Sequence, residues 1–343
     1  MTIQKVEESV RPLEQSVRPL SVQGVIGLTT IVSTQTGIAG LFASYALWRS
    51  KLKLLLLAYF NWVVWDDRAF VVNQQPRKPP SWLNWLPKWL GEYFDLSIVK
   101  TSEIDPHQGP YMFCMHPHGL FGFGPQAVAP RIDSEVSPGL NIRHAGIKGV
   151  FYMPFFREFA IAFNAIPVEE QLMLAHLKEG ISLTVVVGGA SEALLCGYPD
   201  VLPLVLDKRK GFIRLAVRSG ARLVPCLNFG ESQTFTQVFN QKLRNVQNSM
   251  MDVFGYSIPL IAPFFPKRQK LTMVIGAALD PIKIDCDGVE FDQAVDELHT
   301  KYIQAIKSLH EEHRKQYGLP SEQKLVIVSS DEARDLNSLK SKL

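Results

Sequence analysis

Cysteine is scarce in this sequence and follows no regular spacing. Four cysteines occur in 343 residues, Cys114, Cys196, Cys226 and Cys286, and no two of them form a C-x-x-C pair. A disulfide framework needs an even set of cysteines at short intervals, and a zinc knuckle needs pairs of cysteine or histidine ligands. The spacing indicates neither, and we expect the catalytic part of the chain to face the cytosol.

A strong charge of one sign is also absent. Lys and Arg total 36 against 33 Asp and Glu, a formal net charge of +3, which is too balanced for a protein whose main partner is the phosphate backbone of a nucleic acid. The sequence contains no G-x-x-x-x-G-K-[ST] loop and no strand-linked G-x-G-x-x-G. Nucleotide hydrolysis and a dinucleotide cofactor therefore lack support.

Charged residues are missing altogether from Pro19 to Trp48. That run is longer than the roughly 20 apolar residues that cross a bilayer as a helix, so it predicts a membrane-embedded segment. A single span and a hairpin that returns to its starting side both fit, with an ordinary buried apolar region as the alternative. A shorter uncharged stretch, Leu54 to Trp65, follows. The basic residues after the first run place the following chain on the cytosolic side.

Composition divides the chain into four parts. We expect a polar N-terminal segment at 1–20, a membrane anchor at 21–66, a globular catalytic domain at 67–322 and a polar C-terminal tail at 323–343. Short apolar runs in the globular part predict strands over 111–115, 141–147, 183–187, 223–227 and 271–275. Apolar residues spaced three or four apart predict helices over 169–179, 211–219 and 291–309. The alternation predicts an α/β fold with a mostly parallel sheet covered by helices.

Two loops follow predicted strands and carry groups capable of chemistry. The first is His116-Pro117-His118-Gly119, and the second runs from Gly188 and Gly189 to Glu192. Parallel sheets collect their active groups at such strand ends. A carboxylate there can accept the Nδ1 proton of a histidine while the other ring nitrogen acts as a base. Because no nucleophilic Ser or Cys is evident, the substrate's own hydroxyl is the expected nucleophile in an acyl transfer or hydrolysis.

Two other functions remain open at this point. A strand-end His-x-His can bind zinc in a metal hydrolase, although the other histidines show no spacing that commits them to a metal. A lipid-binding protein without catalysis would also keep an apolar anchor. It would have no need of a histidine and a carboxylate together at strand ends.

Four blocks of sequence carry a resemblance to a known family. They are HPHG at 116–119, VVVGGASEAL at 185–194, KRKGFIRLAVRSGARLVPCLNFGE at 208–231 and HTKYIQAIKSLHEEHRKQYGLP at 299–320. In this order and spacing they resemble the diacylglycerol acyltransferase type 2 family, over about residues 93–320. Tyr93-Phe94-Asp95 departs from the family, in which many members have a proline after the Tyr-Phe pair.

The resemblance implies a glycerolipid-acyltransferase-like fold and transfer of a fatty acyl group from acyl-CoA, the co-substrate, to a lipid hydroxyl. Diacylglycerol is the implied acceptor, with monoacylglycerol or a long-chain alcohol as the alternatives. No metal or redox cofactor is expected, because the thioester is already activated. The family also implies the endoplasmic reticulum membrane and lipid droplets, whereas the ending Ser341-Lys342-Leu343 matches a peroxisomal address. A homo-oligomer is left open.

The resemblance also suggests roles for the loop residues. We expect His118 to be the general base and Glu192 its partner. His116 is a third catalytic candidate, which with Gly119 would shape the loop and contribute to the oxyanion site. More distant glycerolipid acyltransferases have an Asp five residues after the histidine, where this chain has phenylalanine. The carboxylate must therefore come from elsewhere, which favours Glu192. Acids in AIPVEE at 165–170, where those relatives have phosphate-binding arginines, favour an uncharged acceptor.

Basic residues are the expected partners of the CoA phosphates. The candidates lie in and beside the third block: Lys208, Arg209, Lys210, Arg218 and Arg222. Their alternative role is a solvated helix face. Arg157 and Glu158 are predicted to form a buried pair that borders the substrate pocket. The glycines Gly119, Gly188 and Gly189 are expected to leave room for substrate.

Overall fold

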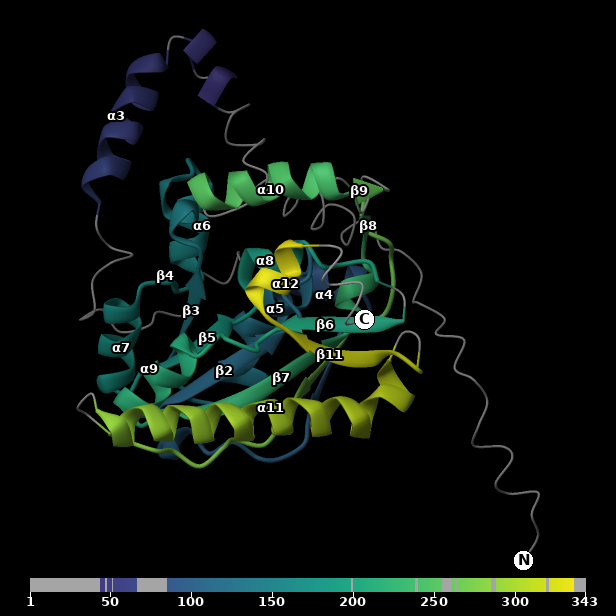
Figure 1. Cartoon of the computed structure of the whole chain (residues 1–343). Coiled ribbons are helices and arrows are strands. Elements are labelled where there is room, and N and C mark those ends of the chain that lie inside the picture. The colour runs from purple at the N-terminus through teal and green to yellow at the C-terminus, as the bar shows by residue number, and fades with distance from the viewer. Residues whose placement is uncertain are drawn as a thin grey trace, which may run out of the picture.

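The computed structural model describes residues 44–46, 48–50, 52–66, 85–198, 200–237, 240–254, 261–262, 265–284, 288–318 and 321–335. Within them a seven-stranded sheet has the order β1-β10-β7-β2-β5-β3-β4 (Figure 1). Its strands are β1 (Ser97–Lys100), β2 (Tyr111–His116), β3 (Ile142–Gly146), β4 (Ala165–Pro167), β5 (Ser182–Val186), β7 (Arg222–Phe229) and β10 (Thr272–Ile275). From β7 to β4 all neighbouring strands are parallel, whereas β10 is antiparallel to β7 and β1 runs with β10. The predicted mostly parallel sheet is confirmed.

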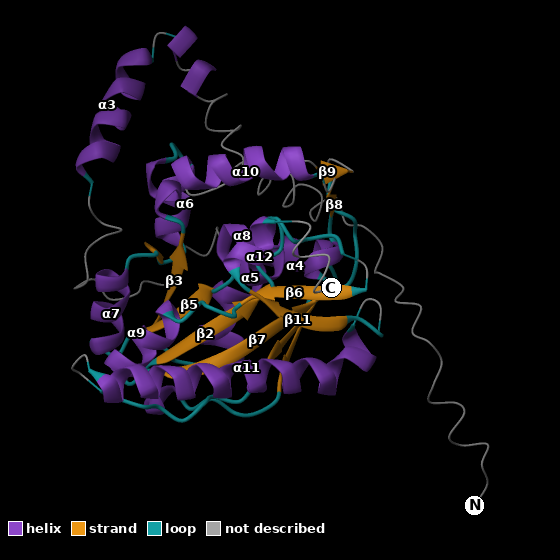
Figure 2. Cartoon of the chain, viewed as in Figure 1, coloured by secondary structure: helices purple, strands orange, loops and turns teal. Residues whose placement is uncertain are grey.

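Helices cover both faces of this sheet (Figure 2). The long helix α11 (Val289–Tyr317) crosses one face beside α7 (Glu170–Lys178) and α9 (Gly211–Ser219), and α4 (Trp85–Tyr93) and α5 (Phe123–Val128) lie on the other side. The other helices are α6 (Phe156–Ala162), α8 (Gly189–Ala193), α10 (Gln241–Phe254) and α12 (Ser330–Arg334), with short turns η5 (Pro106–Gln108), η6 (Ala129–Arg131), η7 (Ile132–Val136), η8 (Lys148–Tyr152) and η9 (Glu231–Gln233). The predicted α/β class is therefore confirmed.

Strand β2 lies at the centre of the core. All six of its side chains are buried, with Met112 and Cys114 packed in the cluster that includes α7, α9 and α11. Phe113 and Met115 point the other way, into a second cluster with η6 and η7. Successive side chains of a strand alternate between faces, so a strand that is apolar at every position is buried on both sides. This burial holds the loop that follows β2 at a fixed place on the sheet edge.

The segment predicted as a polar tail continues the fold. Strand β11 (Lys324–Val328) pairs in parallel with β6 (Val201–Val205) in a separate two-stranded sheet, and another small sheet joins β8 (Thr236–Gln237) to β9 (Ile261–Ala262). Ser329 then begins α12 with a capping box in which Glu332 is the reciprocal partner. The apolar run of β11 and this cap form regular structure up to Arg334, within the segment that was expected to be a polar tail from residue 323.

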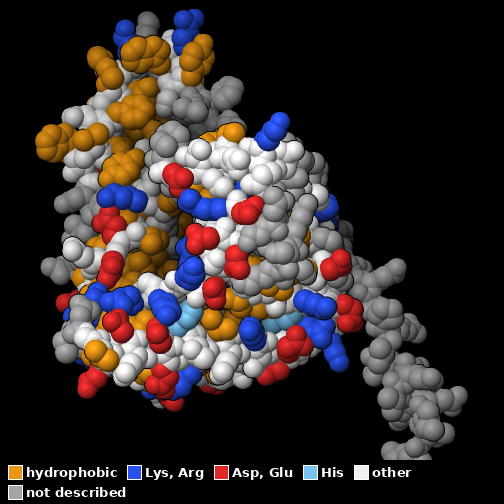
Figure 3. Space-filling model, viewed as in Figure 1, with side chains coloured by type: hydrophobic (Ala, Val, Ile, Leu, Met, Phe, Trp, Pro, Cys, Tyr) orange, Lys and Arg blue, Asp and Glu red, His pale blue; other side chains and the backbone are white. Residues whose placement is uncertain are grey.

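The predicted anchor lies mostly outside the described residues. Its described part contains helix α3 (Lys53–Trp65), in which Leu56 and Val63 are buried but several other apolar side chains face solvent: Leu54, Val64 and Trp65 are 72%, 78% and 78% exposed. Figure 3 shows apolar side chains gathered along the arm that projects from the body, where Figure 1 labels α3. Among the described residues, no helix combines the length and the apolar character that crossing a bilayer would require. The membrane-embedded segment or hairpin stays a prediction.

Helix α3 is tied to α6 by a buried ion pair. Arg157 at the start of α6 lies 2.6 Å from the Asp66 carboxylate, and these side chains are only 1% and 7% exposed. The same guanidinium donates to the Asp66 carbonyl at 2.7 Å and lies over the Trp62 ring. Tyr59 adds a second link by donating to Glu158 at 2.6 Å. Arg157 therefore holds α3, and its contacts do not support the predicted role in binding substrate.

Replacing Arg157 with methionine is expected to lower the free energy of unfolding by about 3–5 kcal/mol, because the buried Asp66 carboxylate would lose the guanidinium that lies 2.6 Å from it. Chemical denaturation of the purified protein in detergent measures the change. The matched control is Lys301→Met, whose ion pair with Glu297 is 55% and 60% exposed and should cost about 0–1 kcal/mol. Equal losses in the two variants would contradict the role given to Arg157.

Candidate active site

Three parallel strands end side by side at one edge of the sheet, and the predicted site lies there. β2 pairs with β5 on one side and with β7 on the other. The histidine loop follows β2, the Gly188–Glu192 turn follows β5, and Gly230 and Glu231 follow β7. Because the three strands point the same way, the loops meet above their carboxyl ends, where Figure 2 shows the short helices α5 and α8.

His118 is held in one tautomer by its own loop. Its Nδ1 lies 2.7 Å from the Gly119 carbonyl oxygen. A carbonyl only accepts hydrogen bonds, so Nδ1 carries the proton and Nε2 keeps its lone pair. Burial is the main cause that lowers the pKa of His118 below its ordinary value of 6.5, and the charge of Arg209 adds to the effect. The imidazole is therefore neutral at pH 7 and able to accept a proton.

Glu192 contacts the histidine loop through the backbone and not through the imidazole. Its carboxylate accepts the backbone N–H of His118 at 2.6 Å and that of Val205 at 2.9 Å. The side chain is 1% exposed, and burial raises its pKa to about 7 despite these two hydrogen bonds. The structure thus brings Glu192 and His118 together, but the Gly119 carbonyl takes the Nδ1 proton that Glu192 was expected to accept.

His116 is buried beneath the loop. It is 0% exposed, its Nε2 lies 2.9 Å from the Tyr302 hydroxyl on α11, and burial lowers its pKa to about 3. The burial of this side chain and its contact with Tyr302 give no support to the catalytic role predicted for His116. The last side chain of β2 points into the core because the strand keeps alternating to its end. His116 instead joins the loop to α11.

The glycines of the loops make room for protein side chains. A Cβ built on Gly119, where φ is +63°, would lie 2.3 Å from a carboxylate oxygen of Glu231. One built on Gly188 would lie 2.0 Å from Glu192, and Gly189, with φ of +58°, faces Arg209 at 3.3 Å. These close approaches, together with positive φ at two of the three positions, explain why glycine is needed here. The substrate role predicted for them has no direct support in the contacts.

Of the predicted phosphate-binding cations, Arg209 is the one beside the candidate site. It donates to the Val187 carbonyl at 3.1 Å, and its charge acts on both Glu192 and His118. Each of the other four predicted cations forms an ion pair: Lys208 with Asp331, Lys210 with Asp296, Arg218 with Glu170 and Arg222 with Asp280. Figure 3 shows acidic and basic side chains interspersed over this face, without one basic patch. The contacts of these four side chains fit the alternative role, a solvated surface, better than a role in binding the CoA phosphates.

Glu231 is a site residue that the sequence analysis missed. Its carboxylate accepts the backbone N–H groups of Phe123 at 3.0 Å and Gly124 at 2.8 Å, and the Asn228 amide donates to it at 2.8 Å. It is fully buried, and burial raises its pKa to about 7. The sequence feature that could have identified Glu231 is its position just after a strand, the same feature that identified Glu192.

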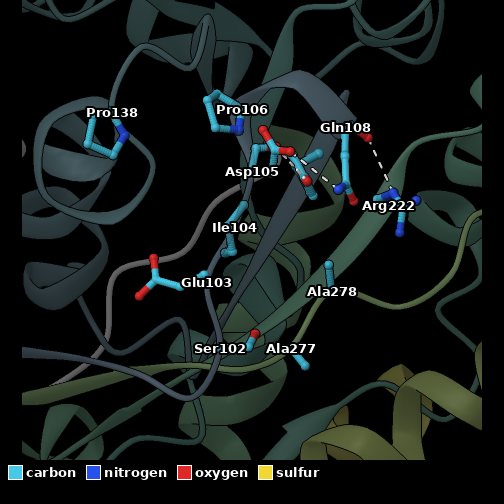
Figure 4. Close-up of a pocket in the computed structure, with 11 residues that line it drawn as sticks. Ser102, Glu103, Ile104, Asp105, Pro106, Gln108, Pro138, Arg222, Ala277 and Ala278 are labelled. Atoms are coloured by element: carbon cyan, nitrogen blue, oxygen red, sulfur yellow. Dashed lines mark hydrogen bonds between the residues drawn. The ribbon is translucent and has the colours of Figure 1, made fainter.

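A cavity of about 600 Å³ lies far from these groups. It is drawn in Figure 4, with Glu103, Asp105, Gln108 and Arg222 among its lining residues. It opens beside Tyr111, at the start of β2, whereas the histidine loop follows the end of that strand. No group of three or more His, Cys, Asp or Glu that could hold a metal occurs in the described part of the chain. The strand-end loops therefore remain the candidate site.

The fold is that of an α/β enzyme, and the polar groups of its candidate site come from the loops that follow β2, β5 and β7. The chain belongs to the diacylglycerol acyltransferase family, whose model matches residues 45–328. The family predicted from the four sequence blocks is thereby confirmed.

Relatives of known name cover most of the chain. Mouse 2-acylglycerol O-acyltransferase 1 is 30% identical over 328 residues, which are 89% of this chain and 93% of the relative. Diacylglycerol O-acyltransferase 1 of Schizosaccharomyces pombe is 32% identical over 278 residues, covering 76% and 78%. Human diacylglycerol O-acyltransferase 2-like protein 6 is 30% identical over 312 residues, covering 84% and 90%.

One solved structure overlaps this chain weakly. The crystal structure of the 1-acyl-sn-glycerophosphate acyltransferase of Thermotoga maritima gives a TM-score of 0.38 at 13% identity, covering 81% of this chain and 99% of its own. We draw nothing from a likeness of this size.

Proposed function

We propose that this protein transfers a fatty acyl group from acyl-CoA to the hydroxyl of a neutral lipid, with diacylglycerol as acceptor and triacylglycerol as product. The observation that carries the proposal is His118, a neutral imidazole with Nδ1 fixed by the Gly119 carbonyl and Nε2 left as the base. Membership of the diacylglycerol acyltransferase family and the names of the relatives support the reaction and the substrate class.

The proposed reaction proceeds by direct attack of the acceptor. Nε2 of His118 removes the proton from the acceptor hydroxyl as its oxygen attacks the thioester carbonyl. The tetrahedral intermediate then expels CoA thiolate, which takes the proton from the imidazolium. Glu192 holds the backbone of His118 and places its negative charge near the imidazolium. The thioester is already activated, so this reaction requires neither a metal nor a redox cofactor.

Monoacylglycerol is the second candidate acceptor. It is favoured by the mouse relative named 2-acylglycerol O-acyltransferase 1, which matches this chain over 89% of its length. The acidic pair Glu169 and Glu170 follows β4, and Lys148 and Arg218 already pair with it. That arrangement disfavours an acceptor that carries a phosphate, and it fits either acylglycerol.

Membrane association belongs to the same proposal. The exposed apolar side chains of α3 are suited to a bilayer surface, and both substrates partition into membranes. Through the Asp66–Arg157 pair, the helix is joined to α6. We place the protein at the endoplasmic reticulum membrane and lipid droplets, with the catalytic domain in the cytosol. The alternative peroxisomal signal at 341–343 lies outside the described residues.

Arg209 is the proposed contact for the CoA phosphates. Arg209→Met is expected to raise the KM for oleoyl-CoA about tenfold or more, since a hydrogen bond to a charged group contributes about 1.5–3 kcal/mol. Lys208→Met is the matched control, because the side chain is adjacent in sequence but 73% exposed, and its KM should stay close to wild type. Steady-state kinetics at saturating diacylglycerol measure both. Equal KM values for the two variants would remove Arg209 from the binding site.

The activity should be lost on acidification. Glu192 and Glu231 have pKa values of about 7, and the pKa of His118 lies below 6.5. The proposed active form has all three unprotonated, so kcat/KM falls as the pH drops below about 7, and falls more steeply at lower pH, where His118 also takes up a proton. A pH–rate profile checks this. Activity that rises between pH 7 and pH 5.5 would contradict it.

Membranes carrying the protein, labelled oleoyl-CoA and one acceptor at a time test the substrate class. Triacylglycerol from diacylglycerol is the expected product, and a chelator should leave its rate unchanged. Product only from monoacylglycerol would select the second candidate. Loss of product in the chelator would contradict the metal-free reaction.

A further inference from the structure

The histidine loop is held from both sides by buried glutamates. β2, which precedes the loop, lies between β5 and β7 in the sheet. The chain after β5 supplies Glu192, and the chain after β7 supplies Glu231. Glu192 binds the loop at its first part, the backbone N–H of His118, whereas Glu231 binds it at the N–H groups of Phe123 and Gly124. The two carboxylates therefore hold the chain after β2 at two places, the backbone of His118 and the first residues of α5.

Glu231 also determines where the Gly119 carbonyl lies. Gly119 packs against the Glu231 side chain so closely that any Cβ there would overlap it. The Gly119 carbonyl in turn accepts the Nδ1 proton of His118. A continuous set of contacts therefore runs from Glu231 through Gly119 to the imidazole, and a shift of Glu231 would change both the direction and the tautomer of that ring.

Asn228 completes the arrangement below the loop. It lies on β7 and is 1% exposed, and its amide donates to Glu231. A Cβ on Gly124 would lie 1.9 Å from the same amide nitrogen, so the loop backbone rests directly on Asn228 as well. The Glu231 carboxylate accepts three hydrogen bonds in total, which compensates for burying it. None of these contacts reaches the exposed side of His118, where substrate would bind.

We propose that Glu231 is a positioning residue for acyl transfer, which acts by holding the histidine loop so that Nε2 of His118 meets the acceptor hydroxyl. This inference rests on the proposed function, because it takes His118 to be the base. Glu231 touches neither substrate nor the reacting atoms. Its effect is on the rate of the chemical step and not on the binding of acyl-CoA.

The test compares Glu231→Gln with a matched control at the other end of β2. Glutamine keeps the shape, but it offers one acceptor oxygen to a site that presents three donors. The control is Ser182→Ala, because Ser182 is also fully buried and its side-chain oxygen also accepts a backbone N–H, that of Tyr111 at 3.0 Å. Four quantities are measured for each variant: kcat, the KM for oleoyl-CoA, the melting temperature, and the rate at which diethyl pyrocarbonate modifies His118, followed by peptide mass spectrometry.

Glu231→Gln should lower kcat about tenfold or more with little change in KM, since small displacements of a catalytic group cost large factors in rate. It should also change the modification rate of His118, while the exposed His107 serves as an internal reference. Ser182→Ala should lower the melting temperature and leave kcat and His118 reactivity as in wild type. Equal effects of the two variants on kcat, or unchanged His118 reactivity in Glu231→Gln, would overturn the proposal.

The modification rate also separates this inference from the proposed function. It reports the placement of the imidazole in the absence of any acyl transfer. If His118→Ala kept full activity, the proposed function would fail whatever Glu231→Gln does. If His118→Ala were inactive and Glu231→Gln left both kcat and His118 reactivity unchanged, the positioning role alone would fail.

Discussion

Replacing His118 with alanine is expected to lower kcat for triacylglycerol formation by about 10²–10⁴, the usual contribution of a positioned base. The imidazole is the group whose tautomer is fixed by the Gly119 carbonyl and whose pKa is lowered by burial. The KM for oleoyl-CoA should change little, because His118 acts on the acceptor hydroxyl. Steady-state kinetics of the purified variant measure both quantities.

The control for this variant is His107→Ala. His107 is exposed in η5, at the start of the strand that His118 follows. Its loss should leave kcat unchanged. A His118→Ala protein with wild-type kcat and an unchanged circular dichroism spectrum would contradict the assignment of the base.

Replacing Glu192 with glutamine is expected to lower kcat about 10- to 100-fold and to cost about 1–3 kcal/mol of stability. Both carboxylate oxygens accept a backbone N–H, from His118 and from Val205. A glutamine can present an acceptor to one of them and must present an amide N–H to the other, which leaves a buried donor unpaired. The affected donor is the backbone N–H of His118 or of Val205, and losing either contact disturbs the side chain that holds the histidine loop, so rate and stability should fall together.

Glu179→Gln provides the comparison for Glu192→Gln. Glu179 is the C-cap residue of α7 and is exposed, so its substitution should change stability by no more than about 0.5 kcal/mol. Steady-state kinetics and thermal unfolding under the same conditions compare the kcat and the stability of the two variants. A Glu192→Gln enzyme with wild-type kcat would show that the carboxylate does not hold the catalytic loop.

Much of the sheet could be predicted from apolar runs. The strand expected at 111–115 is observed as Tyr111–His116 and that at 183–187 as Ser182–Val186, because both are buried on two faces. The helix expected from Phe291 to Leu309 is observed as Val289–Tyr317, with its apolar residues on one face. The short edge strand Ser97–Lys100 and the strand Lys324–Val328 were missed. The first is a short edge strand that buries little, and the second, although apolar, lies in the segment that was predicted to be a polar tail.

The candidate site could be predicted only in part. The predicted strands identified the histidine loop and Glu192 as candidates, because the sequence alone shows which residues follow a strand. The atoms that meet could not be predicted: Glu192 holds a backbone N–H and a carbonyl holds the ring. Glu231 was missed although it follows β7 directly, because its importance appears only when β7 and β2 are known to be neighbours. The sequence did not separate His116 from His118, because it does not show that the last side chain of β2 points into the core.

The most direct test of the account is chemical rescue of His118→Ala by imidazole. Purified wild-type and variant proteins receive labelled oleoyl-CoA and diacylglycerol, with imidazole added in increasing amounts, and triacylglycerol is counted. We predict product from the wild type, almost none from the variant, and a partial recovery in the variant that rises with imidazole concentration, since the added base replaces the missing one. Triacylglycerol formed by His118→Ala at the wild-type rate without imidazole would contradict the account.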